Sequence, residues 1–185
     1  GIDLGTSNSC AAIVKDGVPT LLTWRDGSSL VPSMVALTPR GQLVVGAPAR
    51  AQLTANPRWV IYGFKRLLGR PVDAPEVREA LKRFPWEVVP TEDGMCAAQL
   101  GDRAYRLEEL SALVLREVKL LAEQRLGLPI HRAVITVPAW YSERQREAVR
   151  EAGLLAGLHV ERIINEPTAA ALYWGHSRRR PQRLL

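Results

Sequence analysis

The chain begins with Gly-Ile-Asp-Leu-Gly-Thr-Ser-Asn, residues 1–8. A short apolar strand here delivers a carboxylate, Asp3, two residues before a glycine turn that carries hydroxyl groups. Successive backbone N–H groups in such a turn form a concave site for anions, and Gly5 lets a phosphate approach because it has no Cβ. Asp3 is well placed to hold hydrated Mg²⁺, which takes one or two carboxylates together with water and phosphate oxygens. The stretch therefore predicts a phosphate-binding turn, with a plain tight hairpin as the alternative.

The residues after this turn continue as strands rather than as a helix. Residues 9–14 and 18–23 are joined by Asp16-Gly17, a strong hairpin signal. We therefore expect a three-stranded antiparallel meander. A turn that leads to another strand also differs from the Walker and Rossmann patterns, in which the glycine loop opens a helix.

The clearest helix of the sequence is Leu107–Leu126. Its apolar residues follow the 3–4 spacing of a helix with one break, at Glu117. Gly127 stands where a C-cap glycine belongs, and Pro129 follows it. These signals predict both ends of the helix.

Strands and helices alternate after this helix. Residues 133–137 form a continuous apolar run typical of a strand buried on both faces, and residues 160–164 are expected to form a second buried strand. Ser142 and Gln145 form a capping box for a helix that runs to about residue 157. A last helix is expected over residues 167–174. This order predicts an α/β unit with helices packed on a sheet.

The stretch from residue 26 to residue 105 differs in composition from the rest. It contains most of the prolines and reads as a series of short elements. We expect a hairpin of residues 35–37 and 43–45, a helical turn at 50–54, a helix at 76–84, and strands at 87–89, 95–100 and 103–105. This part of the chain is interpreted as a small inserted α+β region.

Composition is ordinary for a soluble globular protein. The chain has 185 residues, of which 46% are apolar and 24% charged, enough for one medium domain or two small ones that share a core. No apolar run approaches the roughly 20 residues that cross a bilayer, and no secretory signal is recognisable. We expect no membrane association.

A net charge of +6 raises the question of nucleic-acid binding. Arg178, Arg179, Arg180 and Arg183 supply four of these charges, which leaves +2 for the remainder. The cluster is typical of a solvated loop or terminus. No basic stripe with aromatic platforms accompanies it, so we expect no nucleic-acid partner.

Cysteine and histidine usage predicts no metal centre. Cys10 and Cys96 lie far apart without a CxxC spacing, and the three histidines are scattered. A disulfide framework or zinc site needs more than this. The two cysteines are expected to be small, buried or half-buried apolar residues in a reducing compartment.

A second chemical motif is Ile-Asn-Glu-Pro-Thr-Ala-Ala-Ala at residues 164–171. An apolar strand delivers Glu166 directly ahead of a helix that starts with proline. An acid at this position favours the helix dipole, and Asn165 could be an ordinary N-cap. The full string is more informative than either residue alone.

Four strings occur in one order: GIDLGT, FKRLLGR, ITVPAWYSERQREAVREAGLLAGL and RIINEPTAAAL. Together they resemble the ATPase domain of the seventy-kilodalton heat-shock chaperones (the DnaK family), from the actin and sugar-kinase superfamily. The similarity runs from Gly1 to about Gly175. It implies lobe I of an actin-like ATPase: a ribonuclease H-like subdomain of residues 1–32 and 107–185, with an inserted α+β subdomain of residues 33–106.

The resemblance assigns roles to the residues of the first turn. Asp3 is similar to the first carboxylate of the magnesium shell. Gly5, Thr6, Ser7 and Asn8 are similar to the first phosphate loop. The implied cofactors are ATP or ADP with Mg²⁺. Potassium is also known in the family, and the sequence assigns no ligands to it.

Further roles follow from the resemblance outside the turn. Lys65 matches the lysine that reaches the γ-phosphate and the attacking water. Glu166 matches the glutamate near the magnesium ion and the catalytic water. Pro138 resembles the proline switch and Arg146 its relay arginine, which report the nucleotide state to a substrate-binding domain.

The function implied by the resemblance is ATP hydrolysis coupled to binding of unfolded polypeptide. A substrate domain outside the chain would hold these clients, and J-domain and nucleotide-exchange co-chaperones would be the other partners, in the cytoplasm as part of the stress response. The family also uses a second glycine loop, DLGGGT, which is absent from residues 1–185, so we expect this chain alone to hydrolyse no ATP. The alternatives are a non-catalytic partner-binding module, or another member of the superfamily such as a sugar kinase or a filament protein.

Overall fold

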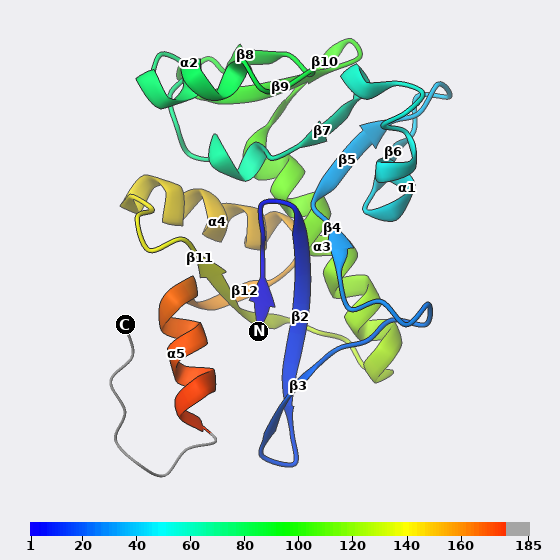
Figure 1. The fold of residues 1–185 in the computed structure, drawn as a ribbon, viewed down its shortest axis with the longest axis vertical. Helices are drawn as coiled ribbons and strands as arrows, with labels where there is room; N and C mark the ends of the chain where they lie inside the picture. The colour runs from blue at the N-terminus through cyan, green and yellow to red at the C-terminus, as the bar shows by residue number, and fades with distance from the viewer. Residues whose placement is uncertain (177–185) are drawn as a thin grey trace.

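The computed structural model describes residues 1–176 and contains a six-stranded sheet flanked by helices (Figure 1). The strand order is β12-β11-β1-β2-β3, and β4 pairs with β2. Strands β1, β11 and β12 run parallel, whereas β2 and β3 form the predicted antiparallel meander with β1. The predicted α/β fold is confirmed. The bounds of these strands are β1 Ile2–Asp3, β2 Asn8–Lys15, β3 Val18–Leu21, β4 Val31–Pro32, β11 Arg132–Val137 and β12 His159–Asn165.

Helices α3 (Leu107–Leu126) and α4 (Glu143–Leu155) supply the core that covers the sheet. Both ends of α3 lie where the sequence predicts them, and Gly127 ends it in the left-handed region at φ 71°. The capping box of Ser142 and Gln145 begins α4. Gly153 allows close packing, since a Cβ there would lie 2.3 Å from Cγ2 of Val160.

The prediction that residues 133–137 are buried on both faces and that residues 160–164 form a second buried strand is wrong. In β11, Ala133, Ile135 and Val137 are buried while the alternate residues are half-buried, and in β12 no residue is buried. For β12 the reason is position, because within residues 1–176 it is an edge strand that pairs with β11 alone. Apolar composition alone does not distinguish a central strand from an edge strand.

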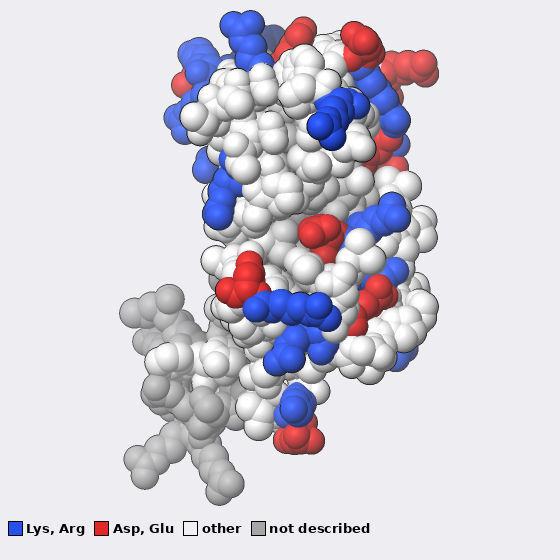
Figure 2. Space-filling model, turned by 90° about the vertical axis from the view of Figure 1, so that its right-hand side faces the viewer, with Lys and Arg blue, Asp and Glu red and all other residues white. Residues whose placement is uncertain are grey.

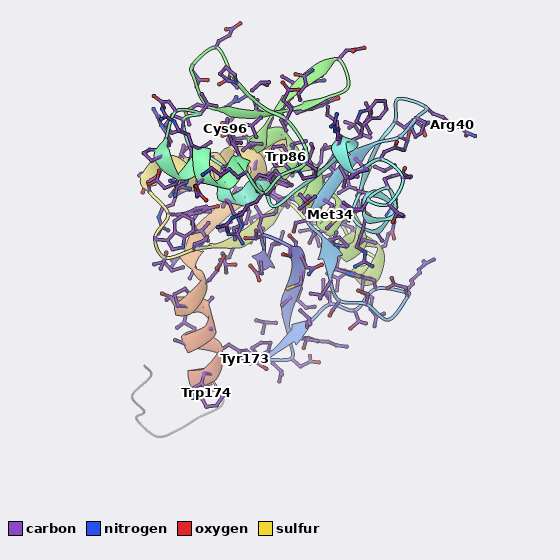
Figure 3. The ribbon with its side chains drawn as sticks, turned by 45° about the horizontal axis from the view of Figure 1, so that its top comes forward. Met34, Arg40, Trp86, Cys96, Tyr173 and Trp174 are labelled. Carbon is purple, nitrogen blue, oxygen red and sulfur yellow. The ribbon has the colours of Figure 1, made fainter. Side chains whose placement is uncertain are left out.

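The last described helix, α5 (Glu166–His176), begins directly after β12 and runs away from the inserted region (Figure 1). It lies largely in solvent, and Leu172 and Tyr173 are 63% and 68% exposed. Tyr173 and Trp174 are labelled near its end in Figure 3. The arginine cluster predicted to be a solvated loop lies outside the described residues.

The inserted region forms two further three-stranded sheets at one end of the molecule (Figure 1). Their orders are β6-β5-β7 and β10-β9-β8, and all their pairings are antiparallel. Their elements are β5 Met34–Leu37, β6 Leu43–Val45, α1 Ala47–Ala51, η1 Pro57–Trp59, β7 Val60–Tyr62, η2 Phe64–Arg66, α2 Pro75–Leu81, β8 Val88–Pro90, β9 Cys96–Leu100 and β10 Arg103–Arg106.

Three local expectations in this region are corrected. The helical turn expected at residues 50–54 is α1, which begins earlier because Pro48 occupies its first turn. Strand β7 was not predicted. Helix α2 ends at Leu81 rather than at residue 84, because Phe84 leaves the helix to stack on Trp86 at 4.7 Å between ring centroids.

The two cysteines are free thiols, as the sequence predicts. Cys96 is buried inside the inserted region (Figure 3), and burial raises the pKa of its thiol to about 11. No helix within residues 1–176 has the length and apolar character needed to span a membrane.

Candidate functional site

The carboxyl ends of the three parallel strands meet at one edge of the large sheet. Asp3 of β1 lies opposite Thr136 of β11, and Thr136 lies opposite Ile164 of β12. Neighbouring strands are about 4.8 Å apart, so Asp3 and Ile164 lie in rows separated by about 10 Å. Glu166 follows two residues beyond Ile164. Open α/β sheets bind ligands outside this edge.

Asp3 is the carboxylate of this edge. It is exposed, and Oγ1 of Thr136 donates a hydrogen bond of 2.9 Å to its Oδ1. The bond fixes one carboxylate oxygen and orients the other toward solvent or a ligand. Thr136 was not predicted as a site residue, although it is the polar residue in the run at 133–137.

The glycine turn between β1 and β2 is too tight for any side chain at Gly5. A Cβ there would lie 2.0 Å from the carbonyl oxygen of Asn8. The carbonyl of Ser7 accepts from the N–H of Ser33 at 2.9 Å, and the hydroxyls of Ser9 and Ser33 are hydrogen-bonded at 2.9 Å in a buried position. The turn is therefore fixed to the chain that follows β4. Asn8 is already the first residue of β2 rather than part of the loop.

Lys65 and Glu166 form an ion pair at this edge. Nζ of Lys65 donates to Oε1 of Glu166 at 2.6 Å, which joins residues 101 positions apart in the sequence. Lys65 is only 4% exposed, whereas the Glu166 side chain is 39% exposed. A lysine is rarely this buried unless it is paired. Glu166 is therefore the member of the pair that a ligand can approach from solvent.

Tyr141 holds the backbone at Lys65. Its buried hydroxyl donates a 2.6 Å hydrogen bond to the carbonyl of Lys65, and Nζ of Lys65 lies 6.0 Å from the centre of the tyrosine ring. Burial raises the pKa of the Tyr141 hydroxyl, and the nearby charge of Glu166 adds to this shift. The phenol therefore remains a neutral donor. It is a second residue of the site that the sequence did not indicate.

Pro138 and Arg146 contact the residues around this pair. The carbonyl of Pro138 accepts from the N–H of Tyr141 at 3.1 Å. The guanidinium of Arg146 donates a 2.7 Å hydrogen bond to Oδ1 of Asn165, the residue before Glu166. Each is thus one hydrogen-bonded neighbour away from the Lys65–Glu166 pair. Asn165, which the sequence suggested as an ordinary N-cap, therefore has a side-chain partner in Arg146.

A cavity of about 780 Å³ opens beside the turn. Thr6 and Ser7 line it together with Arg66, Arg70 and Trp140. The Arg70 guanidinium carbon lies 5.5 Å from the centre of the Trp140 ring. This volume lies within the range of about 300–1,000 Å³ of small-molecule sites. Its charge is mixed, because Glu76 and Glu79 also line it and Arg70 pairs with Glu76 at 3.6 Å. Asp3, Lys65 and Glu166 are not among its lining residues.

A family model described as Hsp70 protein matches residues 1–185. The chain belongs to the Hsp70 family. The match confirms the family resemblance that the sequence motifs carry, and it decides against a sugar kinase or a filament protein. Hsp70 proteins are ATP-hydrolysing chaperones that bind nucleotide with Mg²⁺, so the chain is part of a chaperone ATPase domain.

The edge of the sheet fits the magnesium ion of an Hsp70 ATPase. Within residues 1–176 no group of three carboxylate, histidine or cysteine side chains could enclose a metal. Asp3 instead offers a carboxylate beside a glycine turn that excludes a Cβ. Mg²⁺ is usually held by one or two carboxylates plus water and phosphate oxygens, which is the donor set available here.

Proposed function

We propose that this Hsp70 chain is lobe I of the nucleotide-binding domain of a DnaK-type chaperone. Residues 1–32 and 107–185 would form its ribonuclease H-like subdomain, and residues 33–106 its inserted subdomain. The observation that carries the proposal is the ion pair between buried Lys65 and Glu166, which lies at the same carboxyl edge of the sheet as Asp3.

The residues of the first turn would bind the phosphates of ATP. The backbone N–H groups around Gly5 and the hydroxyls of Thr6 and Ser7 are donors suited to phosphate oxygens, with Asn8 at the start of β2. Asp3 and Glu166 would hold a hydrated Mg²⁺ through water. When bound, the ion supplies positive charge that offsets the charge of the phosphates.

Lys65 would act on the transition state of phosphoryl transfer. Its ammonium group has three N–H donors, of which one bonds to Glu166. The others can reach a phosphate oxygen, and a fixed positive charge in a site shielded from water stabilises charge that develops during transfer. Glu166 would accept a hydrogen bond from the attacking water and orient it. Tyr141 keeps the backbone of Lys65 in place for this role.

Pro138 and Arg146 would connect the nucleotide site to a substrate-binding domain. Support comes from their contacts, since Pro138 bonds to Tyr141 and Arg146 bonds to Asn165. A shift of the Lys65–Glu166 pair on phosphate binding would reach Pro138 through the two hydrogen bonds of Tyr141, and Arg146 through its hydrogen bond to Asn165, the residue before Glu166. In the whole protein this path would couple hydrolysis to unfolded polypeptide clients, with J-domain and nucleotide-exchange proteins as co-chaperones.

Calorimetric titration with Mg-ATP tests the proposal. In the protein that includes the second glycine loop, Asp3→Asn is expected to weaken Mg-ATP binding at least about tenfold, a loss of about 1.4 kcal/mol. Asp102→Asn is the control, because Asp102 is an exposed carboxylate in the turn before β10. Equal affinity for both variants would contradict the proposal.

The same titration applied to residues 1–185 is expected to show much weaker binding and no measurable hydrolysis. One phosphate loop without an opposing loop leaves the phosphates in water. Under those conditions two charges at 4 Å gain only about 1 kcal/mol. Micromolar affinity in this chain would show that lobe I alone suffices for binding.

A further inference from the structure

A second cavity, of about 470 Å³, shares no lining residue with the cavity beside the glycine turn. It lies between the loop before β4, the start of α1 and the C-terminal half of α3. Trp24, Val31, Pro48 and Leu121 supply apolar walls, and Glu117 supplies a carboxylate. Figure 2 looks onto this side of the molecule and shows acidic and basic side chains next to one another across its middle, below a broader uncharged area.

Glu117 is the residue that breaks the apolar spacing of α3. It stands between Val114 and Leu121 on the helix, three and four positions away, so it lies on the same face as they do. Its side chain is half-buried, and burial raises the pKa of its carboxyl group. No side chain among residues 1–176 forms a hydrogen bond or an ion pair with it.

A half-buried carboxylate without a partner among residues 1–176 is less favourable for folding than a fully hydrated one. Removing a carboxylate from water is unfavourable unless a partner replaces the lost hydration. A leucine would continue the apolar face of α3 without this cost. A partly desolvated carboxylate that lines a cavity is a candidate for contact with a ligand.

Trp24 provides a second, independent feature of the cavity. Its side chain is 8% exposed, and its indole Nε1 is buried without a hydrogen-bond partner in the described part of the chain. The unpaired N–H is a hydrogen-bond donor and does not itself select a cation, whereas the face of a tryptophan ring is the best aromatic partner for an organic cation.

The other charged groups of the cavity are at its rim. Arg25, Asp26 and Arg125 are exposed, and Asp26 already accepts a hydrogen bond from the N–H of Ser28 at 2.9 Å. Exposed charges act largely through water and are screened by salt more strongly than partly buried ones. The half-buried carboxylate of Glu117 is screened less and therefore determines which charge the interior prefers.

We propose that this cavity is a binding site for a small organic cation. Its ammonium or amidinium group would pair with Glu117, and its apolar body would lie against Trp24 and Leu121. The cavity volume is within the range of sites for small molecules, about 300–1,000 Å³. This site is independent of the nucleotide site and of the role proposed for Lys65.

Two probes of nearly equal size and different charge test the proposal. 2-Phenylethylamine is a cation at pH 7, and 2-phenylethanol is its neutral counterpart. Each is titrated into residues 1–185, with the indole N–H signal of Trp24 in NMR spectra as the reporter. We expect saturable binding of the amine at least about tenfold tighter than that of the alcohol. Raising the salt concentration should weaken the amine and leave the alcohol unchanged.

Glu117→Gln keeps the shape of the side chain and removes its charge. It is expected to weaken the amine about tenfold and to leave the alcohol within about twofold. Glu92→Gln, in the exposed turn between β8 and β9, is the matched control and should change neither. Equal binding of amine and alcohol, an amine affinity unaffected by Glu117→Gln, or no saturable binding of the amine would each overturn the proposal.

Discussion

Replacing Tyr141 by phenylalanine removes one hydroxyl and keeps the aromatic ring. Tyr141 is 4% exposed, and its hydroxyl donates a 2.6 Å hydrogen bond to the carbonyl of Lys65. Loss of a typical hydrogen bond costs about 0.5–1.5 kcal/mol, and leaving the buried carbonyl without a donor raises the cost to about 1–3 kcal/mol. For a domain of this size each kcal/mol lowers Tm by about 2–4 °C.

Urea unfolding of residues 1–185 measures this cost. The midpoint should fall for Tyr141→Phe while the dependence on urea concentration stays unchanged, because the surface exposed on unfolding is the same. Tyr173→Phe is the control, since Tyr173 is 68% exposed on α5, and it should stay within about 0.5 kcal/mol of the unmodified chain. A Tyr141→Phe effect inside the same limit would refute the assigned role of the hydroxyl in holding Lys65.

Three further predictions concern other contacts. In the full-length protein Arg146→Ala, which loses the hydrogen bond to Asn165, should keep basal ATP hydrolysis and lose its acceleration by peptide. Arg144→Ala is the control. Intact peptide stimulation of Arg146→Ala would contradict the assignment. In urea unfolding, Gly69→Ala should destabilise the chain more than Gly94→Ala. Both glycines have positive φ, but only at Gly69 would a Cβ meet backbone, 2.8 Å from Cα of Gln145. Equal losses of unfolding free energy would show that this contact does not matter. Burial raises the folded-state pKa of Glu117, so its ionisation opposes folding at pH 7. This penalty fades as pH falls through the raised pKa toward the unfolded value of about 4.3. The stability of the unmodified chain relative to Glu117→Gln should therefore rise between pH 7 and pH 5, and a constant difference would exclude the effect.

Local sequence signals predicted the elements whose ends are marked by nearby residues. Leu107–Leu126 was predicted at both ends because the helical period and Gly127 agree. The meander was predicted because Asp16-Gly17 specifies a hairpin, and the two residues adopt φ of 51° and 77°. The edge position of β12 was not predictable in this way, because strand order depends on contacts between distant segments.

The candidate site also combines residues that local strings reveal with residues whose roles depend on distant contacts. The residues of the first turn and Glu166 stand in recognisable strings, whereas nothing local distinguishes Lys65 from a surface lysine beside Arg66. Its burial follows from Glu166, 101 positions away. Thr136 and Tyr141 were missed because their roles depend on strand register and on a long-range hydrogen bond to a backbone carbonyl.

The most direct test of the proposed ATPase site is single-turnover hydrolysis at saturating Mg-ATP, in the protein that includes the second glycine loop. Lys65→Ala should abolish measurable turnover and leave ATP affinity within about tenfold, since removing one group that acts on the transition state costs about 2.7–4 kcal/mol. Lys82→Ala is the matched control, because Lys82 forms a 2.7 Å ion pair with Glu79 on the surface, and it should hydrolyse ATP normally. Near-normal hydrolysis by Lys65→Ala would contradict the account.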